Sequence, residues 1–431
     1  MIKNSPDLDS NQYNLKGYIS IFTSQQFSIF GSAIVQFALI WWLSTAYTET
    51  LVLSLATMAG LLPTILIAPF AGVICDRWNR KKILLLTDSF QALSTLALIL
   101  LFWFNVVELY HIYILLGIRG LMQGLQMPAG ISVMSSMVPS DKITKFNSLN
   151  SMLQALSYLL SPAFGAIAVS NFDIATIYWL DVFTFIPAAI VLLKVSIPSL
   201  PKSLNEKSKI NFIGDIKESL IYLMEKKLFW LILFFALANI FINPLFSLLP
   251  KLISDFYQAS AYFYSFLMII VHVGYIVATI LIMQKKNYIP TIKSIVVNCF
   301  GLSITTLLLY FIPSNGKWLF YPLGALVGFF IALVDVQFMS LLQVVIPKEM
   351  QGRIFSTFFT LIKSLLPLAL ILWGVVADSL SIHSIYLLSP VISLILMVLL
   401  TLFTPLLKLK FESSAIPDDE PKPMEELASN S

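Results

Sequence analysis

Residues 72–82 read GVICDRWNRKK and stand between two long apolar stretches, 51–75 and 82–104. Asp76, Arg77, Arg80, Lys81 and Lys82 place five charges in this short segment. A charged segment between two apolar stretches of about 20 residues is typical of a loop that joins two membrane-spanning helices. The stretch therefore predicts that the chain crosses a bilayer once before this loop and once after it.

The composition extends this interpretation to nearly the whole chain. Hydrophobic residues make up 58% of the 431 residues and charged residues only 12%, with a mean hydropathy of +0.85. Soluble domains carry about 25% charged residues, and transmembrane β-strands would alternate in polarity over about ten residues, a pattern that is not seen here. We predict an all-α integral membrane protein with twelve spans: 17–44, 51–75, 82–104, 111–138, 146–170, 173–196, 228–251, 260–284, 291–313, 317–345, 353–377 and 382–408.

The spacing of the spans predicts two halves joined by a linker. The domains are an N-terminal segment (1–16), a first six-helix bundle (17–196), a polar linker (197–227), a second bundle (228–408) and a disordered acidic tail (409–431). The linker has room for an amphipathic surface helix over 216–223.

Lysine and arginine are concentrated in alternate loops, which indicates the orientation of the chain. The rich set includes 77–82, 142–145, the linker, 285–286 and 348–353, whereas the opposite loops hold only Lys251 and Lys317. Because basic loops stay in the cytoplasm, we expect a multi-pass protein of the cytoplasmic (inner) membrane with both termini inside the cell.

The two halves repeat one another at an offset of 208 residues. Parallel six-helix repeats around a central path are one known design of secondary transporters. The matched pairs are Pro139 with Pro347, Gly120 with Gly328, Ser132 with Ser340, Lys145 with Arg353 and Ser148 with Ser356.

The 72–82 loop resembles the signature loop of the major facilitator superfamily, G-x-x-x-D-R-x-x-R-[RK]. Further stretches resemble the macrolide-efflux branch of its drug:proton antiporters, and this branch is in turn similar to enterobactin-type siderophore exporters. They include Gln36 with Trp41–Leu43, Ile118–Arg119 with Met127–Ala129, Ser157–Ala163 and Gly352–Ser356. The resemblance covers about 18–408 and implies a twelve-helix major facilitator fold of two six-helix bundles related by a pseudo-two-fold axis.

The signature loop is expected to form a conformational latch. Asp76 is placed to interact with the positive N-terminus of a facing helix, which by resemblance is the eleventh helix, starting near Gly352. Such a latch would hold one face shut and break when that face opens. Its residues are Gly72, Asp76, Arg77, Arg80, Lys81, Gly352 and Arg353.

Two further family motifs appear in altered form. The helix-five signature G-P-x-x-G-G reads SPAFGA at 161–166. Pro162 and Gly165 remain, and they predict a hinge because proline interrupts the helical hydrogen bonds and glycine thins the packing. The helix-four signature R-x-x-Q-G appears with one additional residue over Arg119–Gly124.

Ionisable residues inside the spans are candidates for proton coupling, because a charge in the bilayer costs several kcal/mol. Asp335 and Lys363 fall at matched depth, and we expect them to form an ion pair between neighbouring helices. A carboxyl whose partner moves away can load a proton; the alternative is that each carboxyl only ties helices together. The candidates are Asp88, Arg119, Asp181, Asp335 and Lys363.

Polar residues on the first, fourth, seventh and tenth spans are candidates for the substrate path. The abundant aromatic side chains, 33 Phe and 8 Trp, could complete a pocket for an apolar ligand. The path candidates are Gln25, Gln26, Gln36, Gln123, Gln126, Asn239, Asn243 and Gln337.

These features predict a secondary transporter and no enzyme. The sequence has no G-x-x-x-x-G-K-[ST] loop for ATP, no H-E-x-x-H and no G-x-S-x-G, so we expect no metal and no cofactor, with a proton gradient as the energy source. The leading function is proton-coupled efflux of a hydrophobic or amphipathic molecule by a monomer whose partners are substrate, protons and lipid, without nucleic acid. Export of a siderophore, uptake and a non-transporting sensor remain alternatives.

Overall fold

The computed structural model describes residues 14–198, 221, 222, 224, 228–284, 290–346 and 348–408. Within these ranges, the side chains at 69, 72–73, 76–77, 140, 348–353, 356–357 and 359–361 lie outside the description. Most of the linker, the 1–13 segment and the 409–431 tail are likewise outside it, so the predicted surface helix and disordered tail stay predictions.

The N-terminal half consists of six long helices that run up and down. They are α1 (Leu15–Ala46), α2 (Thr50–Arg77), α3 (Arg80–Trp103), α4 (Leu109–Met137), α5 (Ser140–Asn171) and α6 (Ile174–Lys194). Short turns join them, as the sequence predicted. Side chains stabilise several helix starts: Asn79 Oδ1 accepts from Lys82 N at 3.3 Å, and Asp173 Oδ2 accepts from Thr176 N at 3.1 Å. Hydrogen bonds from Thr176 lower the pKa of Asp173.

The C-terminal half repeats this arrangement with six further helices. They are α8 (Leu228–Lys251), α9 (Ala261–Met283), α10 (Ile292–Leu308), α11 (Phe320–Val345), α12 (Lys348–Ser379) and α13 (Ile385–Phe403). A π-helical turn, Leu252–Phe256, continues α8, and short 3₁₀ turns follow α10 and α13. In the described part of the chain, eleven helices are long and apolar enough to cross a membrane, and the remaining one, α4, carries Arg119, Gln123 and Gln126.

Two matched glycines show the internal repeat in three dimensions. A Cβ atom on Gly120 of α4 would lie 1.9 Å from the carbonyl oxygen of Gly60 on α2. A Cβ atom on Gly328 of α11 would lie 1.8 Å from the carbonyl oxygen of Val271 on α9. Only glycine allows the two backbones to approach this closely. The same close contact therefore holds equivalent helix pairs together in both halves.

The two halves meet at one end of the molecule and separate at the other. We call the end with residues 77–82 the basic end and the other the opposite end. At the opposite end, one core joins both halves, with Leu43, Val52 and Leu98 packed with Leu248 and Leu252. Toward the basic end, each half has its own core, one around Tyr18 and Met137 and the other around Leu342 and Phe358.

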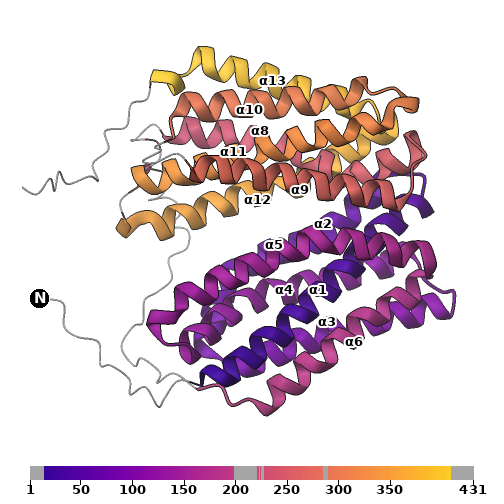
Figure 1. The fold of residues 1–431 in the computed structure, drawn as a ribbon, viewed down its shortest axis with the longest axis vertical. Helices are drawn as coiled ribbons and strands as arrows, with labels where there is room; N and C mark the ends of the chain where they lie inside the picture. Colours follow the sequence, from indigo (N-terminus) through magenta and orange to yellow (C-terminus); the bar gives the residue numbers. More distant parts are fainter. Residues whose placement is uncertain are drawn as a thin grey trace, which may run out of the picture.

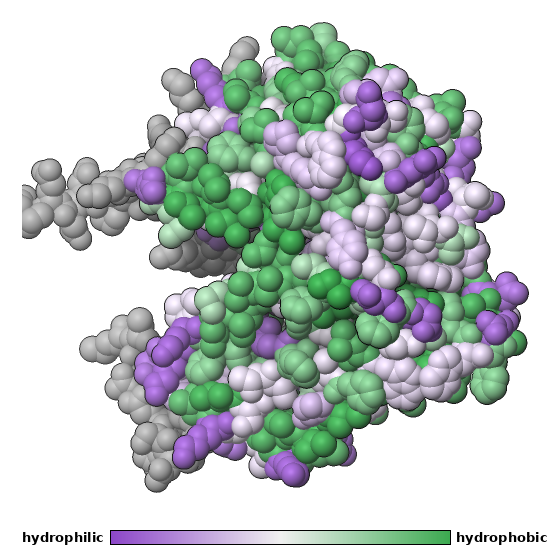
Figure 2. Space-filling view, turned by 45° about the vertical axis from the view of Figure 1, so that its right-hand side comes forward, coloured by the Kyte–Doolittle hydropathy of each residue, from purple (hydrophilic) through white to green (hydrophobic). Residues whose placement is uncertain are grey.

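The figures show the consequence of this packing. The N-terminal and C-terminal bundles approach each other at the right of Figure 1 and diverge toward the left. The space-filling view is hollowed between the halves on the left, and hydrophobic side chains cover much of the surface between its left and right edges (Figure 2). The structure is therefore open at the basic end and closed at the opposite end.

Candidate functional site

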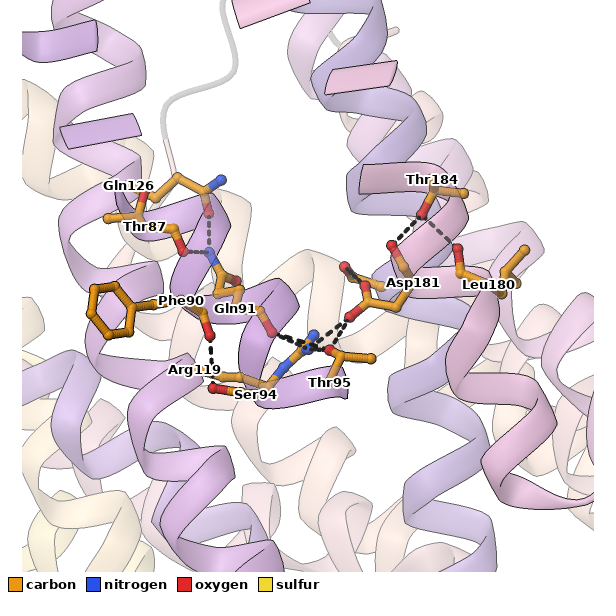
Figure 3. Close-up of polar contacts among 11 residues, drawn as sticks. Thr87, Phe90, Gln91, Ser94, Thr95, Arg119, Gln126, Leu180, Asp181 and Thr184 are labelled. Carbon is orange, nitrogen blue, oxygen red and sulfur yellow. Dashed lines mark hydrogen bonds and ion pairs between the residues drawn. The ribbon is translucent and has the colours of Figure 1, made fainter. Parts of the chain in front are cut away.

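The N-terminal half contains a buried ion pair that links α4 to α6. Arg119 Nη1 lies 2.7 Å from Asp181 Oδ2, and Asp181 is only 5% exposed. Thr95 of α3 donates to the same oxygen at 2.5 Å, and Ser32 of α1 donates to Asp181 Oδ1. Arg119 also donates to Thr95 Oγ1. Four helices therefore contribute to one desolvated charge centre, shown in Figure 3.

A chain of polar groups leads from this pair toward the basic end. Arg119 donates to the carbonyl oxygen of Gln91 at 3.5 Å, and Gln91 Nε2 donates to Gln126 Oε1 at 3.1 Å (Figure 3). Gln126 Nε2 in turn donates to Asp88 Oδ1 at 2.5 Å. Asp88, Gln91 and Thr95 share one face of α3 and span about 10 Å of helix. The two carboxylates are thus the ends of a continuous polar connection.

Gln25 of α1 completes the surroundings of Asp88. Its Nε2 donates to Asp88 Oδ2 at 2.7 Å, so two amides satisfy a carboxylate that is 6% exposed and has no cation partner among the described side chains. Gln26 instead donates to Asn150 Oδ1 of α5 at 2.7 Å. Gln36 and Gln123 are exposed and make no hydrogen bond with the described residues. The structure therefore brings Gln25 and Gln126 together at Asp88 but leaves the other glutamines elsewhere.

The C-terminal half holds a cavity of about 400 Å³ between α8, α11 and α12. The path candidates Asn239 and Asn243 and the proton-coupling candidates Asp335 and Lys363 all line it. The remaining walls are apolar, formed by Phe235, Ile240, Met339, Phe358, Ile362 and Leu366.

The predicted ion pair between Asp335 and Lys363 is not formed in this structure. Neither side chain makes a salt bridge within 4.0 Å or a hydrogen bond with the described residues, although both line the same cavity. Matched depth in the sequence suggested that they could meet, but α11 and α12 contribute them to the cavity without bringing the charged groups within 4.0 Å of each other. Gln337 also departs from its expected place, because it is 4% exposed and accepts from Ser294 and Asn298 of α10.

The expected latch residues are only partly described. Arg80 Nη1 donates to Ser132 O of α4 at 3.2 Å, and Lys81 Nζ donates to Leu193 O and Val195 O at 2.8 Å, where α6 ends. Both cations therefore bind the N-terminal half itself, and Lys81 occupies the negative end of a helix. The side chains of Asp76, Arg77 and Arg353, and the surroundings of Gly72 and Gly352, lie outside the description.

The expected hinge residues lie within an uninterrupted α5. Pro162 is inside the helix, which is continuous over Ser140–Asn171. A Cβ atom on Gly165 would lie 2.4 Å from Phe37 Cδ1 of α1, so this glycine permits close packing between α5 and α1. A hinge motion at these residues remains a prediction.

Charged residues at the opposite end join the two halves. Asp378 of α12 accepts from Thr50 N at 2.5 Å and from Leu51 N at 2.9 Å, which places a carboxylate on the N-terminus of α2. Lys251 of α8 is 2% exposed and donates to Ser44 O and Tyr47 O at the C-terminal end of α1. Each charge therefore faces the favourable end of a helix dipole across the interface.

A family model described as transmembrane secretion effector matches residues 13–430. The chain belongs to this family of major facilitator transporters. This transporter is 29% identical over 380 residues to macrolide efflux protein A of Streptococcus pyogenes, covering 88% of this chain and 93% of the relative. It is also 22% identical to the staphyloferrin A transporter of Staphylococcus aureus, covering 66% and 72% of the two chains. The multidrug efflux pump Tap of Mycolicibacterium fortuitum is 22% identical, covering 83% and 88%.

Solved structures share the fold of this transporter. The nucleoside transporter NupG has a TM-score of 0.65 at 12% identity, covering 88% of this chain and 98% of that one. A bacterial homologue of the iron transporter ferroportin, in an inward-facing state, has a TM-score of 0.67 at 15% identity, covering 90% and 100%. These matches confirm the all-α, twelve-helix major facilitator fold, with many apolar helices crossing the membrane.

Several residues of the buried network and of the contact between the halves were not site candidates in the sequence. Ser32, Thr95 and Gln91 complete the buried network, and Lys251 and Asp378 join the halves. Serine and threonine in membrane helices often bond to their own backbone, so their identity alone carried no signal. The spacing of Asp88, Gln91 and Thr95 on one face of α3 was the available clue, since Asp88 marked that face.

Proposed function

We propose that this protein exports an amphipathic small molecule in exchange for protons, working as a monomer by alternating access with the basic end in the cytoplasm. The observation that carries the proposal is the buried Arg119–Asp181 pair and its polar connection to Asp88. Relatives named macrolide efflux protein and multidrug efflux pump support the direction of transport.

The coupling follows from the cost of separating buried charges. While Arg119 holds Asp181, the carboxylate stays ionised, because the cation and the two hydroxyl donors stabilise the charge. A movement of α4 against α6 that withdraws the guanidinium leaves a desolvated carboxylate, which then takes a proton. Re-forming the pair expels the proton, and Asp88 is the next carboxylate toward the basic end.

The test is uptake of substrate into everted membrane vesicles with an acidic interior. A macrolide, a fluorescent cationic dye and an iron-chelating hydroxycarboxylate are offered separately. We expect gradient-dependent accumulation of at least one compound, its loss in Asp181→Asn, and normal accumulation in Asp141→Asn, since Asp141 is an exposed residue in the first turn of α5. Accumulation that is unchanged in Asp181→Asn would refute the proposed role of the pair.

A second candidate cargo is a siderophore, favoured by the staphyloferrin A transporter relative. In the same vesicles, accumulation of the chelator alone would select this cargo. Binding without accumulation, with the protein folded and the gradient verified, would instead indicate a sensor or an uptake carrier and refute the export proposal.

A further inference from the structure

The cavity of the C-terminal half is built to hold an apolar body. Phe235, Phe338 and Phe358 form an aromatic cluster, with ring centroids 3.9 Å apart between Phe235 and Phe338 and 5.1 Å apart between Phe338 and Phe358. Phe235 and Phe358 face the cavity. Its volume of about 400 Å³ falls within the range of small-molecule sites, roughly 300–1,000 Å³.

Two opposite charges enter this apolar cavity without meeting each other. Asp335 comes from α11 and is partly buried, whereas Lys363 comes from α12, is exposed and also lines the cavity. Among the described residues, neither has an ion-pair or hydrogen-bond partner. For the partly buried Asp335, an unpaired charge in apolar surroundings is costly. A bound molecule could supply the counter-charge that each of the two groups lacks.

The amides of α8 add polar groups to the same wall. Asn243 Nδ2 donates to Asn239 Oδ1 at 2.7 Å, and Asn239 Nδ2 donates to Phe235 O at 2.8 Å. These bonds leave the Asn243 side-chain oxygen without a partner among the described residues. The cavity thus offers the Asp335 carboxylate, the Lys363 ammonium group, an amide oxygen that can accept a hydrogen bond, and an aromatic surface.

We infer that this cavity binds an amphipathic zwitterion, with a ligand cation at Asp335, a ligand anion at Lys363 and an apolar body against Phe235 and Phe358. That this zwitterion is the exported substrate rests on the proposed function; that the cavity binds it does not. A pure cation would satisfy Asp335 but add repulsion from Lys363, and a pure anion would do the reverse. A molecule with both charges neutralises both side chains at once.

The experiment is equilibrium binding to the purified full-length protein in nanodiscs, with no gradient. Three fluorescent ligands share one apolar group and nearly the same linker: Nε-dansyl-lysine (zwitterion), dansylcadaverine (cation) and dansyl-6-aminohexanoate (anion). We expect the zwitterion to bind at least about tenfold more tightly than either single-charge ligand, which corresponds to about 1.4 kcal/mol.

Two variants separate the roles of the charges. Asp335→Asn is expected to weaken zwitterion binding to the level of the anion, and Lys363→Gln to weaken it to the level of the cation. The matched controls, Asp141→Asn on α5 and Lys293→Gln on α10, are exposed, lie outside the cavity and should bind like the wild type. If a single variant folds poorly, the exchange Asp335→Lys with Lys363→Asp keeps both charges and should recover the zwitterion preference.

Three results would overturn the inference. They are equal affinity for all three ligands, tightest binding of the cation with further tightening in Lys363→Gln, and unchanged zwitterion binding in both single variants. Because binding is measured without a gradient, failure here leaves proton-driven export standing. Conversely, zwitterion binding by a protein that exports nothing would refute the proposed function alone.

Discussion

At the scale of single residues, the Arg119–Asp181 pair is both a structural tie and the proposed coupling group. Asp181 accepts hydrogen bonds from Thr95 and Ser32 and forms an ion pair with Arg119. These three partners stabilise the ionised carboxylate in the state that is open at the basic end. Removing one partner of a buried pair typically costs about 3–5 kcal/mol, whereas replacing both by apolar groups is often nearly neutral. The two roles can therefore be separated by experiment.

We predict that Asp181→Ala lowers the thermal stability of the purified protein strongly, because it leaves the Arg119 cation buried and unpaired. The double variant Arg119→Met, Asp181→Leu should regain much of that stability while transport remains lost. Thermal unfolding in detergent and vesicle transport measure the two readouts. A double variant that is stable and still shows proton-driven transport would contradict the coupling role.

Residue identity predicted the charge centres but not their partners. The cost of placing a charge in the bilayer singled out Asp88, Arg119 and Asp181, and the structure joins these three in one network. The same reasoning expected Asp335 and Lys363 to pair, and that expectation was wrong for this state. Position along a helix indicates the depth of a side chain in the membrane. Whether two side chains pair also depends on how each helix is rotated about its axis and on the distance between the helices.

At the scale of helices, glycine contacts set the spacing of equivalent pairs. We predict that Gly120→Ala lowers the yield of folded protein, because its Cβ would lie 1.9 Å from Gly60 O on a neighbouring backbone. Gly60→Ala is the matched control, since a Cβ there meets nothing within 4 Å. Size-exclusion profiles of the two variants test this. Equal yields would show that α2 and α4 can move apart at little cost.

The helices themselves were predictable because the bilayer requires about 20 apolar residues and leaves few alternatives. The expected span 51–75 corresponds to helix α2, which covers Thr50–Arg77, and the expected span 382–408 corresponds to α13, which covers Ile385–Phe403. The caps at Asn79 and Asp173 follow ordinary preferences. How the helices pack laterally, which places Gln337 against α10, depends on tertiary contacts that hydropathy does not report.

At the scale of the whole molecule, the closed opposite end depends on charges set against helix ends. We predict that Asp378→Ala shifts the population toward a state open at that end, because α2 loses two bonds to its first N–H groups, worth about 0.5–2 kcal/mol. Spin labels at Thr48 and Ser381, both exposed, would report a longer distance. The described native cysteines, Cys75 and Cys299, are buried.

The matched control for this measurement is Asp173→Ala, an exposed cap on α6 within one half. Its distance distribution should match that of the wild type. An unchanged distribution in Asp378→Ala would show that the shared core around Leu43 and Leu248 closes this end without the charge contact.

Substrate-driven proton movement shows whether the Arg119–Asp181 pair couples export to proton flow. Everted vesicles are acidified inside, the gradient is followed with a pH-sensitive dye, and an exported compound is added. We predict that wild-type vesicles lose part of the gradient on addition, whereas Asp181→Asn vesicles keep it. Export of the compound with no proton movement, or an equal response in Asp181→Asn, would contradict proton coupling through the Arg119–Asp181 pair.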